Sequence, residues 1–210
     1  MKLCFFTCIT FSFFLSGLIS CKPTLQLETI PAFTSETTVN CIIEIPAGTN
    51  KKIEFNKTTK RFKIDKINGV ERIKDYLPYP ANYGFIPATF SDKAKGGDGD
   101  PIDILLLCES IPTGSVIEAY PIAMLRVLDD GEMDDKIICI PKDPELQVIQ
   151  AEDITEFQEK YPKALEIIEL WFQYNDTTEP IVLNGWVNKK ETIAEIKRVS
   201  TWYQETNFPE

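Results

Sequence analysis

Short apolar runs separated by polar turns make up most of residues 39–140. The runs are β-branched or alternate between apolar and polar positions, which is typical of β-strands. Turn residues such as Asn68-Gly69 separate them, and three prolines predict an extended segment over residues 77–87. Short strands spaced by about 8–12 residues predict a closed or nearly closed barrel. The expected strands are residues 39–45, 51–55, 61–66, 102–108, 116–120, 122–127 and 136–140.

After residue 160 the spacing of apolar residues changes to that of a helix. Tyr161-Pro162 is expected to open one helix, because proline suits a first turn. Asn188 is expected to cap a second helix. The pattern thus predicts an α+β fold, a small β-barrel with two flanking α-helices. The apolar stripes are Leu165, Ile167, Ile168, Trp171 and Phe172 in the first helix and Ile193, Ile196, Val199 and Trp202 in the second.

We do not expect the amino-terminal stretch to be part of the folded domain. Lys2 precedes a Phe-rich apolar run over residues 3–19, followed by Ser20 and Cys21. This stretch resembles a bacterial lipobox, which implies export, cleavage before Cys21 and lipidation of that thiol. An uncleaved anchor helix is the alternative, although about 17 apolar residues are marginal for spanning a bilayer. We expect a signal peptide at residues 1–20, a linker at 21–37 and a single domain at 38–210, held at the periplasmic face of a membrane by the lipid anchor only.

Composition excludes several kinds of partner and catalytic site. The net charge is −10, which argues against nucleic acid as a partner because phosphate backbones need Lys and Arg surfaces. The chain has no histidine, so a histidine base, a Ser-His-Asp triad and a histidine-ligated zinc site are all excluded. Beyond the signal peptide and Cys21, three cysteines remain in strand-like runs, and we expect buried free thiols at Cys41, Cys108 and Cys139.

Two acidic turns carry the candidate chemistry. Asp98, Asp100 and Asp103 follow a Gly-Gly pair and precede the apolar run 104–107, so a turn should bring three carboxylates to the start of a buried strand. Residues 129–136 form a second acidic turn. Like charges this close repel one another unless a cation lies between them, and hard divalent cations prefer oxygen ligands. A solvated acidic turn is the alternative.

Five motifs in order resemble the family I soluble inorganic pyrophosphatases, over residues 39 to 174. The first residues to carry the resemblance are Asp98-Gly99-Asp100-Pro101-Ile102-Asp103, which match that family's Asp-x-Asp-Pro-x-Asp signature. The other motifs are Tyr79-Pro80-Ala81-Asn82-Tyr83-Gly84-Phe85-Ile86-Pro87, Glu44-Ile45-Pro46, Lys52-Ile53-Glu54, and Asp129 with Asp134 and Lys136.

The resemblance implies a closed five-stranded barrel, OB-like, with flanking helices and extra short strands. It implies hydrolysis of inorganic diphosphate to two phosphates with several Mg²⁺ ions, for which Mn²⁺ or Zn²⁺ are possible substitutes. A metal-activated water would attack directly and Asp100 would act as general base. Relatives form dimers or hexamers, so the chain is expected to be a homo-oligomer. The implied metal ligands are Asp98, Asp103, Asp129, Asp134, Glu54 and Glu44; the implied substrate contacts are Lys52, Arg72, Tyr83, Lys136 and Tyr174, supported by Tyr79.

The chain departs from the family at residue 175, and its Glu44–Lys52 and Arg72–Tyr79 spacings are each about one residue shorter than in the bacterial form. The family usually has a lysine after the tyrosine that ends the first long helix, whereas Asn175 follows Tyr174 here. An inactive, lipid-anchored binding protein is therefore one rival. A calcium module is another, because Asp98 and Glu109 are spaced like the first and last ligands of an EF-hand loop, but Ile102 occupies a ligand position. Most relatives are cytoplasmic, so the cytoplasm is the alternative location.

Overall fold

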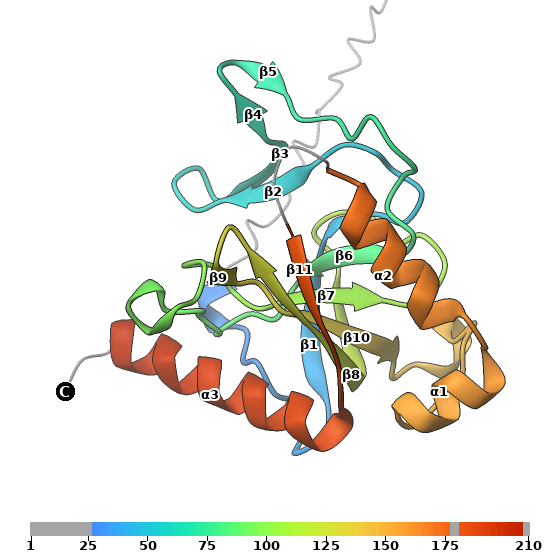
Figure 1. The fold of residues 1–210 in the computed structure, drawn as a ribbon. Helices are drawn as coiled ribbons and strands as arrows, with labels where there is room; N and C mark the ends of the chain where they lie inside the picture. Colours follow the sequence, from blue (N-terminus) through green and yellow to red (C-terminus); the bar gives the residue numbers. More distant parts are fainter. Residues whose placement is uncertain (1–26, 177–180, 208–210) are drawn as a thin grey trace, which may run out of the picture.

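A ring of paired strands forms the centre of the molecule (Figure 1). The computed structural model describes residues 27–176 and 181–207; the signal peptide and Cys21 lie outside these residues. Within them, neighbouring strands pair in the order β1, β6, β7, β10 and β8, and β8 pairs with β1 again, which closes the ring. The β7–β10 pair is parallel and the other four pairs are antiparallel. The ring strands are β1 (Val39–Ile45), β6 (Asn82–Phe85), β7 (Asp103–Leu106), β8 (Val116–Asp129) and β10 (Lys136–Pro141).

Smaller elements attach to this ring. Two hairpins, β2–β3 and β4–β5, lie above it in Figure 1, while β9 and β11 both pair with β8. Short 3-10 helices complete the loops. The remaining strands are β2 (Ile53–Asn56), β3 (Arg61–Ile64), β4 (Lys66–Ile67), β5 (Val70–Glu71), β9 (Glu132–Met133) and β11 (Ile181–Asn188); the 3-10 helices are η1 (Leu27–Thr29), η2 (Lys93–Lys95) and η3 (Pro144–Leu146).

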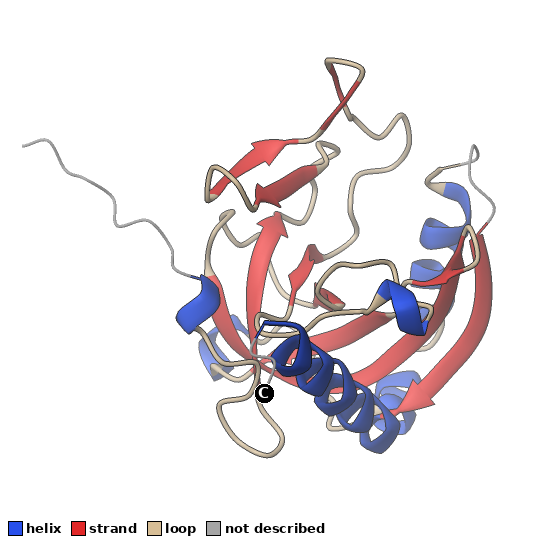
Figure 2. Cartoon of the chain, turned by 90° about the vertical axis from the view of Figure 1, so that its left-hand side faces the viewer, coloured by secondary structure: helices blue, strands red, loops and turns tan. Residues whose placement is uncertain are grey.

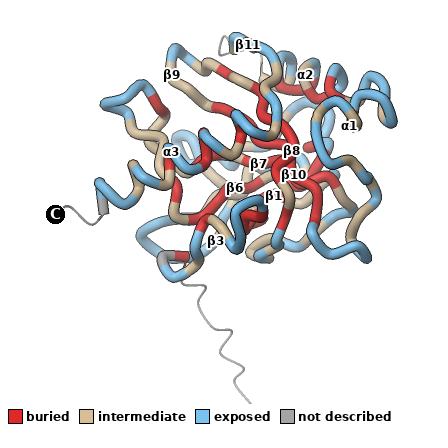
Figure 3. The backbone as a smooth tube through the Cα atoms, turned by 90° about the horizontal axis from the view of Figure 1, so that it is seen from below, coloured by how far each residue is buried: buried red, intermediate tan, exposed pale blue. Residues whose placement is uncertain are grey.

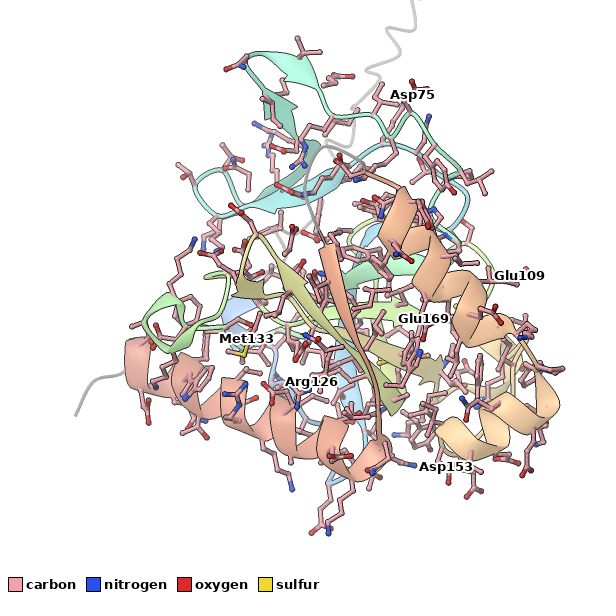
Figure 4. All side chains as sticks on the ribbon, viewed as in Figure 1. Asp75, Glu109, Arg126, Met133, Asp153 and Glu169 are labelled. Carbon is pink, nitrogen blue, oxygen red and sulfur yellow. The ribbon has the colours of Figure 1, made fainter. Side chains whose placement is uncertain are left out.

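The described residues form three α-helices: α1 (Ile154–Lys160), α2 (Ala164–Tyr174) and α3 (Lys189–Asn207). The helix α3 runs along one side of the sheet, and α1 and α2 lie together on another (Figure 2). Arg126 in β8 and Glu195 in α3 form an ion pair at 3.4 Å, and Figure 4 shows Arg126 pointing toward α3.

Alternate residues of the strands face two different hydrophobic clusters. Leu105 and Ile138 belong to a cluster with Trp171 and Phe172 of α2, whereas Ile104 and Ile137 belong to a cluster with Ile196 and Val199 of α3. Successive side chains of a strand point to opposite faces, so a strand between two cores is apolar throughout. Figure 3 shows the result, with buried backbone in the sheet and exposed backbone on the outer faces of the helices.

The expected α+β class is confirmed, and the strand predictions mostly agree with the structure. One correction concerns residues 116–127, which were expected to form two strands and instead belong to the single strand β8. Pro121 lies in its interior, opposite Cys139, where the register with β10 shifts. A proline has no N–H for the ladder, and this irregular position accommodates it.

The prediction of two helices was wrong for the described residues, because an additional helix, α1, lies before α2 in the chain. Asp153 caps α1 by accepting a hydrogen bond from Thr155 N at 2.9 Å. Only Phe157 in this seven-residue helix is buried, so the sequence has no apolar stripe from which the helix could be predicted. The strand β11 was also missed. Gly185, with φ of 84°, lies where its register with β8 shifts, and this interruption breaks the alternation that identifies a strand. The α2 helix starts at Ala164, just after the predicted Tyr161-Pro162.

The predicted cap and free thiols are confirmed. Asn188 Oδ1 accepts from Glu191 N at 3.1 Å at the start of α3. Among the described residues Cys41, Cys108 and Cys139 are free, the first and last of them buried and Cys108 half-buried.

The described part of the expected linker lies against the sheet, where Leu27 and Ala32 are buried. No helix within the described ranges is long and apolar enough to cross a membrane.

The close approach of β1 and β6 depends on Gly84. A Cβ atom at this position would lie 1.9 Å from the carbonyl oxygen of Ile42. We expect Gly84→Ala to lower the free energy of unfolding by at least about 3 kcal/mol, because backbone atoms of the ring must move apart. Gly69→Ala, in the β4–β5 turn where φ is 81° and a Cβ would meet nothing, should cost only about 1 kcal/mol. Urea unfolding of the two variants tests this, and equal losses would contradict it.

Candidate active site

A cavity of about 550 Å³ opens where the β2–β3 hairpin faces the ends of β1 and β7 and the β8–β9 turn. It brings together residues from segments far apart in the chain. Nine of the predicted site residues line it, namely Glu44, Lys52, Glu54, Tyr83, Asp98, Asp100, Asp103, Asp129 and Asp134.

Lys136 lies beside this cavity as a buried cation. Its residue is 4% exposed, and its Nζ donates to Asp103 Oδ2 at 2.6 Å and also to Asp134 Oδ1. The parallel register makes Lys136 of β10 the direct partner of Asp103 of β7. Burial alone would lower the pKa of Lys136, but the two carboxylates outweigh burial and raise it, so the ammonium stays charged.

Backbone pairing joins the two acidic turns. Met133 N donates to Gly96 O at 2.8 Å, and Gly97 and Met133 form an isolated parallel bridge. This contact holds the loop that carries Asp98 against the turn that carries Asp134. Asp98 Oδ1 in turn accepts from Asp100 N at 3.0 Å, which shapes the loop locally. The two acidic stretches thus converge, as the family resemblance implied, and long-range backbone contacts bring them together.

Tyr83 forms part of the inner wall of the cavity, and Tyr79 packs behind it. Tyr83 OH donates a hydrogen bond to Asp103 Oδ2, and burial together with Asp103 and Asp134 raises the pKa of Tyr83, which keeps its hydroxyl protonated. Tyr79 is 5% exposed and its ring packs 5.4 Å from that of Tyr83 and 4.7 Å from that of Trp171. Tyr79 therefore lies behind the cavity lining, where it can support Tyr83.

Burial raises the pKa of three carboxylates in the cluster. The pKa of Asp98 is raised to about 6, that of Asp103 to about 7 and that of Glu44 to about 8, with burial as the largest cause in each. Asp134 adds to the shift of Asp103, although Lys136 opposes it. Glu44 also accepts from Phe55 N at 2.7 Å. Burial thus disfavours the ionised forms of these carboxylates, and a cation bound between them would favour ionisation.

Asp100 lies at the rim, where its carboxylate forms an ion pair with Lys57 at 2.8 Å. Lys57 falls between the expected strands 51–55 and 61–66, and no motif assigned it a role. Only pairing of the β2–β3 hairpin above the ring brings it to Asp100. Other lining residues that the motifs did not include are Lys60, Asp130, Glu132 and Tyr203.

Arg72 and Tyr174, both expected to contact substrate, do not line this cavity. Arg72 donates to Asp65 Oδ2 at 3.1 Å and lines a smaller neighbouring cavity, and Tyr174 is 49% exposed at the end of α2. Figure 4 shows Glu109 on the α2 side of the molecule, far from Met133 near the acidic turns. Glu109 is not among the lining residues and β7 is buried, which removes the EF-hand alternative.

A family model described as inorganic pyrophosphatase matches residues 41–204. The chain belongs to the inorganic pyrophosphatase family. An inorganic pyrophosphatase of Synechocystis sp. is 39% identical over 130 residues, which cover 60% of this chain and 70% of that protein. A soluble inorganic pyrophosphatase of Oryza sativa subsp. indica is 32% identical over 183 residues, 85% of this chain and 78% of that protein. The crystal structure of an N-terminally truncated Trypanosoma cruzi vacuolar soluble pyrophosphatase with PPi has a TM-score of 0.73 at 28% identity, covering 85% of this chain and 73% of that chain.

The donor set of this pyrophosphatase-family cavity fits hard divalent cations. Its candidate ligands are all carboxylate oxygens, the donors that Mg²⁺ prefers, and they are half-buried in the cavity wall. Among the described residues no group of three or more acidic or thiol side chains is already arranged as a metal cage. Lys136 instead neutralises Asp103 and Asp134 from within the fold.

We expect Lys136→Met to lower the free energy of unfolding by about 3–5 kcal/mol in EDTA, because it leaves two carboxylates without their buried partner. Mg²⁺ should raise the Tm of this variant more than that of the unaltered protein, since a cation in the cavity would stabilise the same carboxylates. Thermal unfolding followed by circular dichroism measures both effects.

Lys142→Met is the matched control, because Lys142 forms an exposed ion pair with Glu118 at 2.6 Å. It should leave the Tm unchanged with and without Mg²⁺. Equal Mg²⁺-dependent shifts for Lys136→Met and the unaltered protein would contradict the expected cation site.

Proposed function

We propose that this chain hydrolyses inorganic diphosphate to two phosphates with Mg²⁺ as cofactor. One observation carries the proposal: a single cavity gathers the acidic motif residues of a pyrophosphatase family member, with lysines beside them. The PPi complex of the Trypanosoma cruzi relative, which has the same overall fold, supports the choice of substrate. The closed strand ring is in keeping with the OB-like barrel implied by the resemblance, and self-association as a homo-oligomer stays a prediction.

The proposed Mg²⁺ ligands are the carboxylates of the two acidic turns and of the first two strands. When bound, such ions polarise phosphoryl oxygens and lower the pKa of coordinated water. Mn²⁺ and Zn²⁺ are proposed substitutes, because they accept oxygen ligands as well. The proposed ligands are Asp98, Asp103, Asp129, Asp134, Glu54 and Glu44.

In the proposed reaction a water oxygen forms a bond to one phosphorus atom and the bridging P–O bond breaks. Asp100 accepts the proton of the attacking water, and its position at the open rim leaves room for that water. Cationic and hydroxyl side chains stabilise charge on the two phosphoryl groups, which is the largest contribution expected for phosphoryl transfer. The proposed contacts are Lys52, Arg72, Lys136, Tyr83 and Tyr174, with Tyr79 in a supporting position.

The purified protein should release phosphate from diphosphate when Mg²⁺ is present and not in EDTA. We expect Asp100→Asn to reduce kcat by at least about 100-fold, because the amide cannot accept the proton. A phosphate-release assay measures this. Asp75→Asn is the control, since Asp75 is exposed and lies outside both cavities (Figure 4).

Two outcomes would contradict the proposal. If the unaltered protein shows no Mg²⁺-dependent turnover, the chain is an inactive member of the family. Full activity of a folded Asp100→Asn variant would remove Asp100 as the base and leave the reaction itself in place.

We also propose that Cys21 is lipidated and anchors the domain at the periplasmic face. The support comes only from the sequence, since Cys21 lies outside the described residues. A radiolabelled fatty acid should label the protein in cells, and Cys21→Ser should lose the label and move the protein from the membrane fraction to the soluble fraction. A cytoplasmic, unlabelled protein would contradict the anchor and favour the alternative location.

A further inference from the structure

A second, smaller cavity of about 170 Å³ adjoins the candidate active site. Lys52 lines both cavities and therefore connects them. Arg72 and Lys74 line the smaller cavity as well, so three cationic side chains meet there, and its acidic lining residues within the described part of the chain are Glu71 and Asp176. The large cavity is dominated by carboxylates and the small one by cations.

Asn175, which stands where the family usually has a lysine, lies at the carboxyl end of α2. Asn175 Nδ2 donates to the carbonyl oxygens of Trp171 at 3.1 Å and Phe172 at 2.9 Å, so its amide closes the last turn of α2. Lys189 does not replace the expected lysine, because its Nζ donates to Glu152 O at 3.1 Å, beside the start of α1.

Lys74 brings a positive charge to the position next to Asn175. Its side chain is 16% exposed and its Nζ lies 3.5 Å from Asp176 Oδ2, just beyond the carboxyl end of α2, where a cation is favoured. Backbone pairing fixes this placement, since Lys74 N donates to Asn50 O at 2.8 Å.

The three cations differ in how tightly they are paired. Lys52 lies 3.0 Å from Glu54 and Arg72 lies 3.1 Å from Asp65, whereas the Lys74 pair is longer. Burial lowers the pKa of Lys74; Asp176 opposes this, but Lys52 and Arg72 lower it further. Two neighbouring cations thus crowd a half-buried ammonium with a loosely held partner. A phosphate group in this cavity would relieve that repulsion.

We propose that Lys74 is a substrate-binding residue that contacts a phosphoryl group and supplies the charge that Asn175 does not. This inference rests on the proposed function, because it assigns the small cavity to one of the two phosphates of diphosphate. Lys74 would bind that phosphate together with Lys52 and Arg72, at the side of the site opposite the carboxylates.

Steady-state kinetics test the proposal. Lys74→Met should lower kcat/KM for diphosphate by on the order of 10-fold to 100-fold, mainly through KM, because one charge-assisted hydrogen bond is lost. Lys66→Met, in the β4–β5 hairpin and outside both cavities, should leave kcat/KM unchanged. The decisive variant is Lys74→Met with Asn175→Lys, which should recover most of the loss. An unchanged kcat/KM in Lys74→Met, or a loss that Asn175→Lys does not recover, would overturn the proposal.

Binding of inorganic phosphate gives a readout that does not need turnover. Isothermal titration calorimetry should show at least tenfold weaker phosphate binding by Lys74→Met than by the unaltered protein and by Lys66→Met. If the unaltered protein lacks turnover yet shows this difference, the proposed function fails and the phosphate contact stands. Equal phosphate affinity for all three proteins would overturn the role of Lys74 whether or not the enzyme is active.

Discussion

The buried ion cluster of Lys136 with Asp103 and Asp134 is the interaction on which the rest of the site depends. Removing the Lys136 ammonium from water is costly, and its pairing with two half-buried carboxylates offsets that cost. The parallel β7–β10 register places Lys136 opposite Asp103, and the β8–β9 turn brings Asp134 to the same ammonium. The cluster therefore couples the register of two ring strands to the position of a loop, and both acidic turns meet the cavity because of it.

The two sides of the site carry mostly opposite charges. The carboxylate side gathers oxygen donors such as those of Asp98 and Asp103, so it is suited to bind divalent cations, and its ionised groups would repel a bare anion. The cationic side, with Arg72 and Lys74, is suited to bind an anion directly. Lys52 belongs to both sides. Diphosphate with its metal ions needs such a divided surface, because its oxygens must be shared between metals and cationic side chains.

The β2–β3 hairpin completes the cavity from above the ring. Its turn carries Lys57 to Asp100, and its first strand carries Glu54 beside Lys52. The two hairpin strands pair with each other, and contacts of their side chains and backbone hold the hairpin to the ring. Phe55 N donates to Glu44 Oε1 of β1 at 2.7 Å, and Phe55 and Phe62 pack against Ile42 and Phe85.

What the sequence by itself determined is local. Alternating or apolar runs identified the ring strands except β6, for which the prolines predicted only an extended segment. Asn188 marked the start of α3, and the spacing of Asp98, Asp100 and Asp103 placed three carboxylates on one loop, because these features depend on neighbours within a few residues. The tertiary structure decided the rest: that Met133 pairs with Gly97, that Lys57 faces Asp100, and that Lys74 pairs with Asp176, the residue after Asn175. It also decided β11, whose strand forms by pairing with β8 despite the break at Gly185. These outcomes depend on which backbone groups pair across long stretches of chain, and residues that are distant in sequence carry no local mark of the partner they will meet.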